Sequence, residues 1–201
     1  RYHCLLATAV LNKDFTPKKA CAMLPVRQYG TGSDTLGGGR VEGEIWFAAK
    51  AILRLNGGAA FKNYYLNEDI AARDGLVCGG TMYFYLEPLR ERDDFVPIGS
   101  EIVEAYDGGQ PVSLATVVNA KDGGPALGAK LLLRSDGSIT GTLGNTELDA
   151  QATEIAQRVA DVGSNEFFSN AEATEIFVEG FTTPPTLVMV GGGHVGKATA
   201  D

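Results

Sequence analysis

The sequence contains few cysteines, few histidines and no long apolar run. Its three cysteines, Cys4, Cys21 and Cys78, form an odd and sparse set, so we expect a reducing cytoplasm rather than a disulfide framework. Two histidines, and no CxxC or HExxH motif, exclude a histidine-rich metal site. No apolar run approaches the length of a membrane span, and the first residues do not resemble a signal peptide.

Positive charge is also scarce. The 17 Lys and Arg residues stand against 25 Asp and Glu residues, which gives a formal net charge of −8. An acidic chain without a basic stripe is a poor candidate for binding nucleic acid or an anionic membrane surface. The length of 201 residues suffices for one or two domains with real cores. We therefore expect a globular protein whose partners are neither nucleic acid nor membrane.

One pattern occurs twice along the chain, and repeats are best sought before the fold. Each copy has an apolar run with a threonine, a proline, a second apolar run, a Thr-Leu-Gly turn, an acidic residue, a helical stretch and a strand with a late glutamate. The matched positions are 6–10 with 114–118, Pro17 with Pro125, 20–24 with 128–132, 35–37 with 142–144, Glu42 with Asp149, 44–55 with 150–162, and 83–87 with 175–179. So many ordered matches favour an internal duplication, with too few copies and too long a period for a solenoid.

Each copy predicts an α/β unit of strand, loop, strand, turn, helix and strand. Residues 5–11 and 112–119 are apolar and β-rich, which indicates strands. Apolar residues recur at helical spacing in 44–55, and Asn56-Gly57-Gly58 ends that helix. Asp136-Gly137 indicates a turn between two strands of the second copy.

The second copy carries an additional helix before its first strand. Ser100 is the expected N-cap, and Gly108-Gly109 is the expected end. The first copy begins directly at its strand, so we infer that a matching helix is missing there. The chain opens without Met, and we expect this end to be incomplete.

A glycine cluster lies between a strand and a helix in the first copy. Glycines at Gly37, Gly38 and Gly39 let the backbone approach a ligand closely, and the free N–H groups of the helix start favour an anion. Arg40 adds donors for a phosphate or carboxylate, and Glu42 accepts from a ring N–H or a hydroxyl. The alternative is a tight turn in which Glu42 is only a favourable first-turn charge.

The second copy bears on this choice. At the same place it reads Gly-Asn-Thr-Glu-Leu-Asp over 144–149, so the apolar pattern is kept while the triple glycine is lost. A turn needed only for folding would keep its special backbone residues in both copies. The difference favours a ligand for the glycines of the first copy.

A second glycine cluster, Cys78-Gly79-Gly80, precedes the last strand of the first copy. A thiolate beside two glycines is accessible to a ligand and soft enough for molybdenum or sulfur chemistry. The alternative is a small buried apolar cysteine. The second copy lacks this segment as well, so both special clusters fall in one copy and indicate one ligand site there.

The third cluster follows an apolar run at 186–190 and fits GxGxxG with Gly191, Gly193 and Gly196. This pattern is typical of the phosphate-binding turn that opens a Rossmann domain. The acidic residue that would bind the ribose, about 20 residues further on, falls past residue 201. We expect the Rossmann unit to be truncated here, and the choice of nucleotide stays open.

These three motifs, in this order, resemble the XdhC/CoxI family of accessory proteins of xanthine dehydrogenase, carbon monoxide dehydrogenase and related molybdenum hydroxylases. The family shows a Thr-Pro segment, a Gly-Gly-Gly-x-Val-Glu turn, a Cys-Gly-Gly before a strand ending in Glu-Pro, and a Rossmann opening Val-x-Val-Gly-Gly-Gly-His-Val-Gly. In this sequence these are Thr16-Pro17, residues 37–42, Cys78-Gly79-Gly80, Glu87-Pro88 and residues 188–196. The chain departs from the family around 13–18, and its second α/β copy exceeds the simplest family plan.

The resemblance implies an α/β fold with two tandem XdhC/CoxI-type domains, at 1–92 and 98–182, and the first strand, turn and helix of a Rossmann domain at 186–201. It implies a maturation chaperone, not an enzyme, that binds the molybdenum cofactor (molybdopterin). Its partners would be a cysteine desulfurase, which supplies the sulfido ligand, and an apo-hydroxylase, which receives the cofactor.

The resemblance also suggests roles for individual residues. Residues 37–39 and Arg40 would meet the phosphate, Glu42 the pterin, and Cys78 the molybdenum or sulfur end, with Gly79 and Gly80 beside it. The turn at 191–196 would bind NAD(P) or another nucleotide. The second copy, with its altered loops, would be structural or dimerising, and a homo-oligomer with exchanged Rossmann elements is expected.

Two alternatives remain. One is an NAD(P)-dependent oxidoreductase built on the Rossmann unit, for which the sequence offers no obvious general base. The other is a scaffold between desulfurase and hydroxylase, which would not need the glycine clusters that only the first copy has.

Overall fold

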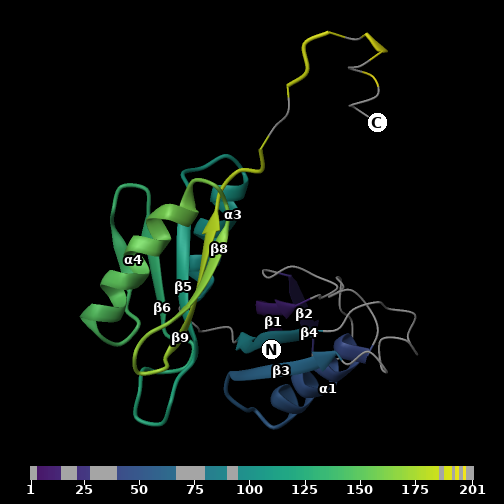
Figure 1. The fold of residues 1–201 in the computed structure, drawn as a ribbon, viewed down its shortest axis with the longest axis vertical. Coiled ribbons are helices and arrows are strands. Elements are labelled where there is room, and N and C mark those ends of the chain that lie inside the picture. The colour runs from purple at the N-terminus through teal and green to yellow at the C-terminus, as the bar shows by residue number, and fades with distance from the viewer. Residues whose placement is uncertain are drawn as a thin grey trace.

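The computed structural model describes residues 4–14, 22–27, 40–66, 80–89, 95–185, 188–191, 193–194 and 197. Within these residues the chain forms an α/β structure with two antiparallel sheets, one in each half, and three helices (Figure 1). The α/β class expected from the sequence is confirmed. None of the described helices is long and apolar enough to cross a membrane.

The first half is a four-stranded sheet covered on one face by one helix. Small and branched residues of the central strand, Leu5, Ala7 and Ala9, alternate toward the helix and pack against its Ile45 and other apolar residues. The strand order is β2-β1-β4-β3. The elements are β1 (Cys4–Asp14), β2 (Met23–Arg27), α1 (Arg40–Arg54), β3 (Ala60–Leu66) and β4 (Gly80–Leu89).

The second half is a five-stranded sheet with helices on both faces. The amphipathic helix α4 buries Leu148 and Ala152 on one face, while α3 packs Ile98 and Ala105 over part of the other. Strand order is β7-β6-β5-β9-β8. The elements are α3 (Phe95–Tyr106), β5 (Val112–Asn119), β6 (Lys130–Arg134), β7 (Ile139–Gly141), α4 (Thr146–Ala160), β8 (Asn165–Ser169) and β9 (Glu175–Phe181).

The two sheets share their pairing in detail. The register of β1 on β4 shifts between Ala9 and Leu11, and that of β5 on β9 shifts between Val117 and Asn119. These are the same positions of the two central strands, so both sheets carry a bulge at the same place. The internal duplication itself stays a prediction, but the likeness of the halves extends from sequence to register.

The register corrects one detail of the sequence pairing. Thr8 pairs with Met23 in the first sheet, and its counterpart Thr116 pairs with Lys130 in the second. Met23, rather than Ala22, is therefore the counterpart of Lys130. The sequence comparison missed this because the stretch between the paired residues is one residue longer in the first half, from Thr8 to Met23, than in the second, from Thr116 to Lys130, and such a change leaves no mark in an apolar run.

Three other expectations were wrong or incomplete. α3 begins at Phe95, so Ser100 lies inside the helix, where its hydroxyl donates to the carbonyl of Val96. The left-handed residue at the end of α1 is Asn56, with φ 52°, where asparagine is the usual substitute for glycine. Strands β3 and β8 were not expected, because both are short edge strands in which aromatic and polar residues mix.

The C-terminal segment projects away from both sheets (Figure 1). Val188, Met189 and Val190 are exposed and belong to no strand, in contrast to the apolar strand expected there. Gly191 has φ 110°, and the N–H of Lys197 donates to the carbonyl of Gly193 at 3.0 Å. A glycine turn followed by a helical hydrogen bond is compatible with a Rossmann opening, which stays a prediction.

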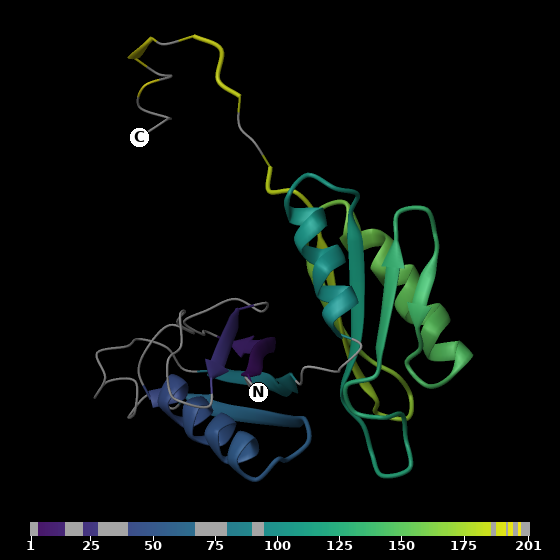
Figure 2. The same ribbon diagram turned by 180° about the vertical axis from the view of Figure 1, so that it is seen from behind.

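The two halves meet through the sheet faces that α1 and α4 leave open, with the strands of one sheet running across those of the other (Figures 1 and 2). One apolar cluster spans the contact, with Val10 and Tyr85 from the first half and Val118 and Phe177 from the second. These four side chains are buried. The contact therefore creates a further core between the sheets, in addition to the cores that the sheets form with their helices.

Candidate functional site

The structure describes only part of the site expected from the sequence. Residues 37–39, 78–79 and 196 lie outside the described residues. Arg40 opens α1, Glu42 lies half-buried in its first turn, and Gly80 is the buried first residue of β4. Gly191 and Gly193 lie in the exposed C-terminal segment.

The described ends of the two first-half clusters lie at the same end of the first sheet. Gly80 pairs with Asp14 on one side and Leu66 on the other, so it marks the end of the sheet at which β1 and β3 finish. The short link 55–59 joins the end of α1 to the start of β3, so α1 begins at that same end of the sheet (Figure 2). The fold thus brings the start of α1 and the start of β4 together.

The corresponding turn of the second half is closed by its own side chains. Asn145 is the N-cap of α4 and accepts from the N–H of Leu148 at 2.8 Å. Asp149 accepts from the N–H of Leu143 at 2.7 Å and from the hydroxyl of Thr142 at 2.8 Å. The N–H of Leu148 is therefore satisfied by a side chain, and the turn that leads into the helix is held by Asp149.

The second half shows one structural role that an acidic residue at this position can have. Asp149 corresponds to Glu42, since α1 and α4 bury equivalent positions, and it fastens its own turn. This gives the structural alternative for Glu42 a concrete example. Asn145 corresponds to Gly38, which has no side chain and so cannot supply the kind of cap that satisfies the N–H of Leu148 in the second copy.

The link that carries Cys78 in the first half is a tight turn in the second. Strands β8 and β9 are joined by residues 170–174, where the Asn170 side chain accepts from the N–H groups of Glu172 and Thr174. This self-contained turn has no room for a counterpart of the 13 residues between β3 and β4. The sequence comparison had located this difference correctly.

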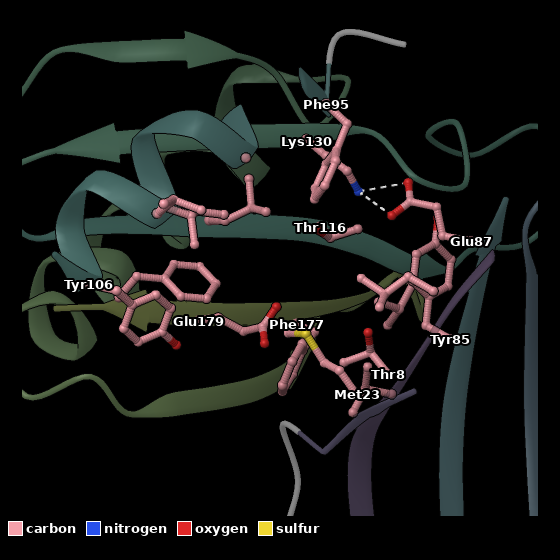
Figure 3. A pocket seen from close by; sticks show the side chains of 18 residues that line it. Thr8, Met23, Tyr85, Glu87, Phe95, Tyr106, Thr116, Lys130, Phe177 and Glu179 are labelled. Carbon is pink, nitrogen blue, oxygen red and sulfur yellow. Dashed lines mark hydrogen bonds and ion pairs between the residues drawn. The ribbon is translucent and has the colours of Figure 1, made fainter. Parts of the chain in front are cut away.

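A cavity of about 310 Å³ lies between the two sheets (Figure 3). Both halves contribute equivalent positions to its wall: Thr8 and Thr116, Glu87 and Glu179, Leu6 and Leu114, Val10 and Val118, Tyr85 and Phe177, and Met23 and Lys130. Helix α3 adds Phe95, Gly99 and Tyr106. The wall is mostly apolar with a few polar groups, which is the usual composition of a small-molecule site.

Charge in this cavity is arranged as one ion pair and one further carboxylate. Lys130 Nζ lies 2.8 Å from Oε1 and 3.0 Å from Oε2 of Glu87, and also over the rings of Tyr85 and Phe95, 5.8 and 5.7 Å from their centroids. Glu179 reaches the cavity from β9 and is 7% exposed. The only cation among the described lining residues is thus already engaged by Glu87.

Buried hydroxyl groups complete the polar lining. Thr8 and Thr116 are each 6% exposed and Tyr85 is 3% exposed. The Tyr85 hydroxyl makes no hydrogen bond of good geometry with the described residues, although it lies close to the Glu87 carboxylate. It packs against Gly128, where a Cβ would come within 2.6 Å of it. Burial, followed by the negative charge of Glu87 and the hydrogen-bonding contact with that carboxylate, raises the pKa of the Tyr85 phenol, so this group stays neutral at physiological pH.

This cavity was missed by reasoning from the sequence, although the signal was present. A threonine within an apolar strand and a glutamate late in the last strand occur in both copies, at Thr8 and Thr116 and at Glu87 and Glu179. Such polar residues on a strand flanked by apolar ones point to a buried polar function. The sequence did not indicate that the two faces would meet.

The described residues contain no group of three or more His, Cys, Asp or Glu side chains that could hold a metal ion. Cys4 is the described cysteine; burial raises the pKa of its thiol, partly opposed by Arg27, so it is a weak nucleophile. Cys78, the expected molybdenum or sulfur ligand, lies outside the described residues.

Comparison with known proteins points to one family. The model of the XdhC and CoxI family matches residues 105–169, which confirms the resemblance seen in the sequence for this segment. The match covers the second half, whereas the quoted motifs lie mainly in the first half and in the C-terminal segment.

Two similar proteins extend beyond this chain. Uncharacterized protein YqeB of Escherichia coli (strain K12) is 29% identical over 104 residues, which cover 45% of this chain and 19% of that protein. A solved structure described as a xanthine dehydrogenase of Bacillus halodurans superposes with a TM-score of 0.62 at 17% identity, over 90% of this chain and 49% of that one. At this identity the second likeness shows a shared fold.

Proposed function

We propose, from the premise that residues 105–169 are an XdhC and CoxI family segment, that this chain is part of an accessory protein of a molybdenum hydroxylase. Its task is to bind the molybdenum cofactor as cargo, to assist a cysteine desulfurase in its sulfuration, and to deliver it to the apo-hydroxylase in the cytoplasm. The similar structure from Bacillus halodurans is itself described as a xanthine dehydrogenase, which agrees with this association.

The observation that carries the proposal is the difference between the two helix starts. In the second half Asn145 satisfies the N–H of Leu148, whereas the first half has Gly38 at the equivalent position. Because glycine supplies no side-chain acceptor at that position, the N–H donors and the dipole of the 15-residue helix α1 favour an anion. The phosphate of the pterin is such an anion.

The cargo would therefore lie at the edge of the first sheet, where α1 and β4 begin. The backbone of residues 37–39 and the guanidinium of Arg40 would bind the phosphate, and Glu42 would accept from the pterin ring. Cys78, followed by Gly79 and buried Gly80, would approach the molybdenum or sulfur end. The second copy, closed by its own side chains, would be the structural member of a duplicated pair.

The remaining parts of the proposal concern residues 186–201. We propose that they begin a Rossmann domain that binds NAD(P) or another nucleotide through Gly191, Gly193 and Gly196, and that a homo-oligomer can exchange this element. The exposure of Val188 and Val190 supports this, because a strand of that composition needs a sheet to cover it. An oxidoreductase built on this domain is the second candidate.

The test exchanges the cap between the halves. We expect the full chain to bind added molybdopterin, measured after acid oxidation as fluorescent pterin retained per protein. Gly38→Asn should place a side-chain oxygen where the phosphate binds and weaken retention at least about tenfold, the loss of one or two charge-assisted hydrogen bonds. Cys78→Ser should leave the pterin bound but reduce retained molybdenum or sulfur.

Asn145→Gly is the matched control, since it opens the equivalent helix start in the half that we regard as structural. It should leave pterin retention unchanged. Equal pterin retention by the wild type and Gly38→Asn would contradict an anion site at the start of α1. A wild-type chain that retains no pterin at all would refute the proposal that the chain carries the molybdenum cofactor. A thermal shift with NAD(P) but none with molybdopterin would favour the oxidoreductase.

A further inference from the structure

The cavity between the sheets is independent of the glycine clusters and is built entirely from described residues. We propose that it binds a small, flat, neutral or cationic ring compound that carries N–H donors. This site is separate from the cargo site of the proposed function, which lies at the α1 and β4 edge of the first sheet.

The shape of the cavity favours a ring compound. Its volume of about 310 Å³ is at the small end of the range for ligand pockets. Phe177 and Tyr106 line it together with Phe95 (Figure 3), and branched residues of both central strands fill the rest of the wall. Aromatic side chains around an apolar space accept a flat ring through stacked or edge contacts.

The charges select against an anion. Lys130 is already paired with Glu87, so its charge is balanced without a carboxylate from a ligand. Glu179 brings a second carboxyl group to the same enclosed space, in which it is 7% exposed. A phosphate or carboxylate ligand would lose its hydration there without gaining a cation, because Lys130 is the only cation among the described lining residues and is already paired. N–H donors on a ligand would instead find an acceptor in the carboxyl group of Glu179.

The buried hydroxyl groups point to a ligand as well. Tyr85 is 3% exposed, and its hydroxyl makes no hydrogen bond of good geometry with the described residues, although buried polar groups in native proteins are generally satisfied. Thr8 and Thr116 are buried in the wall beside it. A polar atom on a bound ring would give the Tyr85 hydroxyl a well-placed partner.

The test uses a pair of probes of equal shape and opposite charge. 2-Aminobenzimidazole is a flat bicycle whose N–C–N edge donates to a carboxylate, and benzimidazole-2-carboxylate is its anionic counterpart. Titration calorimetry on the full chain should show saturable binding of the amine and at least about tenfold weaker binding of the carboxylate. Equal affinity for both probes, or no binding of the amine, would overturn the proposal.

Variants then assign the binding to this cavity. Gly99→Leu should abolish it by filling the space from α3; the new Cβ would meet only the Phe95 ring, at 3.7 Å, and leucine favours the helix more than glycine does. Glu179→Gln should weaken the amine about tenfold and narrow its advantage over the carboxylate. Thermal melts of both variants verify that they are folded.

Glu166→Gln is the control, because it makes the same chemical change on β8, where Glu166 forms an exposed ion pair with Arg158. It should bind the amine like the wild type. Amine binding that survives Gly99→Leu in a folded protein would place the probe elsewhere and refute the cavity site. Neither probe carries a phosphate, so this outcome is independent of the molybdopterin test.

Discussion

At the scale of single residues, Tyr85 combines a well-packed ring with a buried hydroxyl that makes no hydrogen bond of good geometry with the described residues. Its ring belongs to the apolar cluster with Val10 and Phe177, so its burial is favourable. Its hydroxyl is buried as well but gains no hydrogen bond from the described residues. The ring thus stabilises the protein, whereas the hydroxyl carries an uncompensated loss of hydration.

Replacing this hydroxyl with hydrogen should stabilise the free protein. We expect Tyr85→Phe to raise the free energy of unfolding by about 1 kcal/mol at pH 7, measured by urea denaturation. Because burial raises the pKa of the folded phenol, the wild type should also lose stability as pH rises above about 10, the value for an unfolded tyrosine. The gain of the variant should therefore increase above that pH.

The opposite sign would be equally informative. A Tyr85→Phe variant that is less stable at pH 7 would mean that the hydroxyl has a hydrogen-bond partner in solution. Phe61→Leu, which alters a neighbouring aromatic ring stacked on Tyr83, is a suitable comparison for general loss of packing.

Single residues also show what can be predicted from local pattern. The glycines and Cys78 stand out by type and spacing, so a site near them can be predicted without a fold, and that site stays a prediction. Lys130 does not stand out, because its partner Glu87 lies in the other half of the chain. A pair formed between distant faces leaves no local pattern, and only the repeated glutamates hinted at it.

At the scale of elements, side-chain hydrogen bonds hold the start of α4. The Asn145 side chain caps Leu148, and Asp149 binds back to Leu143. Helix α3 is fixed differently, by Arg134 of β6, which donates to both carboxylate oxygens of Glu101 at 2.5 and 2.7 Å. This bond lowers the pKa of Glu101.

Removing the cap should weaken α4 measurably. We expect Asn145→Ala to lower the free energy of unfolding by about 1 kcal/mol, because the N–H of Leu148 loses its acceptor. Thermal denaturation followed by circular dichroism measures the change. Ser169→Ala, whose hydroxyl is exposed and bonds only to its neighbour Asn170, should be near neutral, and an equally neutral Asn145→Ala would show that water replaces the cap.

The main elements followed from the sequence more readily than the edges. The central strands are apolar throughout and the helices repeat at helical spacing, so 5–11, 112–119 and 44–55 were recognised. Strand β3 reads Ala-Phe-Lys-Asn-Tyr-Tyr-Leu and has a half-exposed face. Such a strand is defined by its pairing with β4, which is a tertiary interaction and is absent from local pattern.

At the scale of the whole molecule, the relation between the halves depends on a contact that no single half contains. The apolar cluster of Val10, Tyr85, Val118 and Phe177 is joined there by the ion pair of Lys130 and Glu87. Both charged side chains are largely buried, with 12% and 18% exposure. Loss of either partner would leave a poorly hydrated charge between the sheets.

This contact can be tested with a double-mutant cycle. We expect Lys130→Met, which installs the residue type of its counterpart Met23, to lower the free energy of unfolding by about 2 to 3 kcal/mol, somewhat less than for a fully buried pair. Glu87→Gln in the same chain should recover part of that loss. Urea denaturation of the four proteins gives the coupling energy.

A coupling energy near zero would mean that the pair is broken in solution and that the halves are held by apolar contacts alone. Arg158→Met with Glu166→Gln is the control cycle, because that ion pair lies within the second half and is exposed. Its coupling should be below about 1 kcal/mol.

The difference between Met23 and Lys130 has a consequence for anything that enters the space between the sheets. Two identical halves would enclose a chamber with interchangeable ends, and a guest could sit in it either way round. Here a cation fastens one glutamate while the other, Glu179, has a methionine where the lysine would be. The two ends of the cavity therefore differ, so a ligand that recognises one carboxyl group must bind in a single orientation.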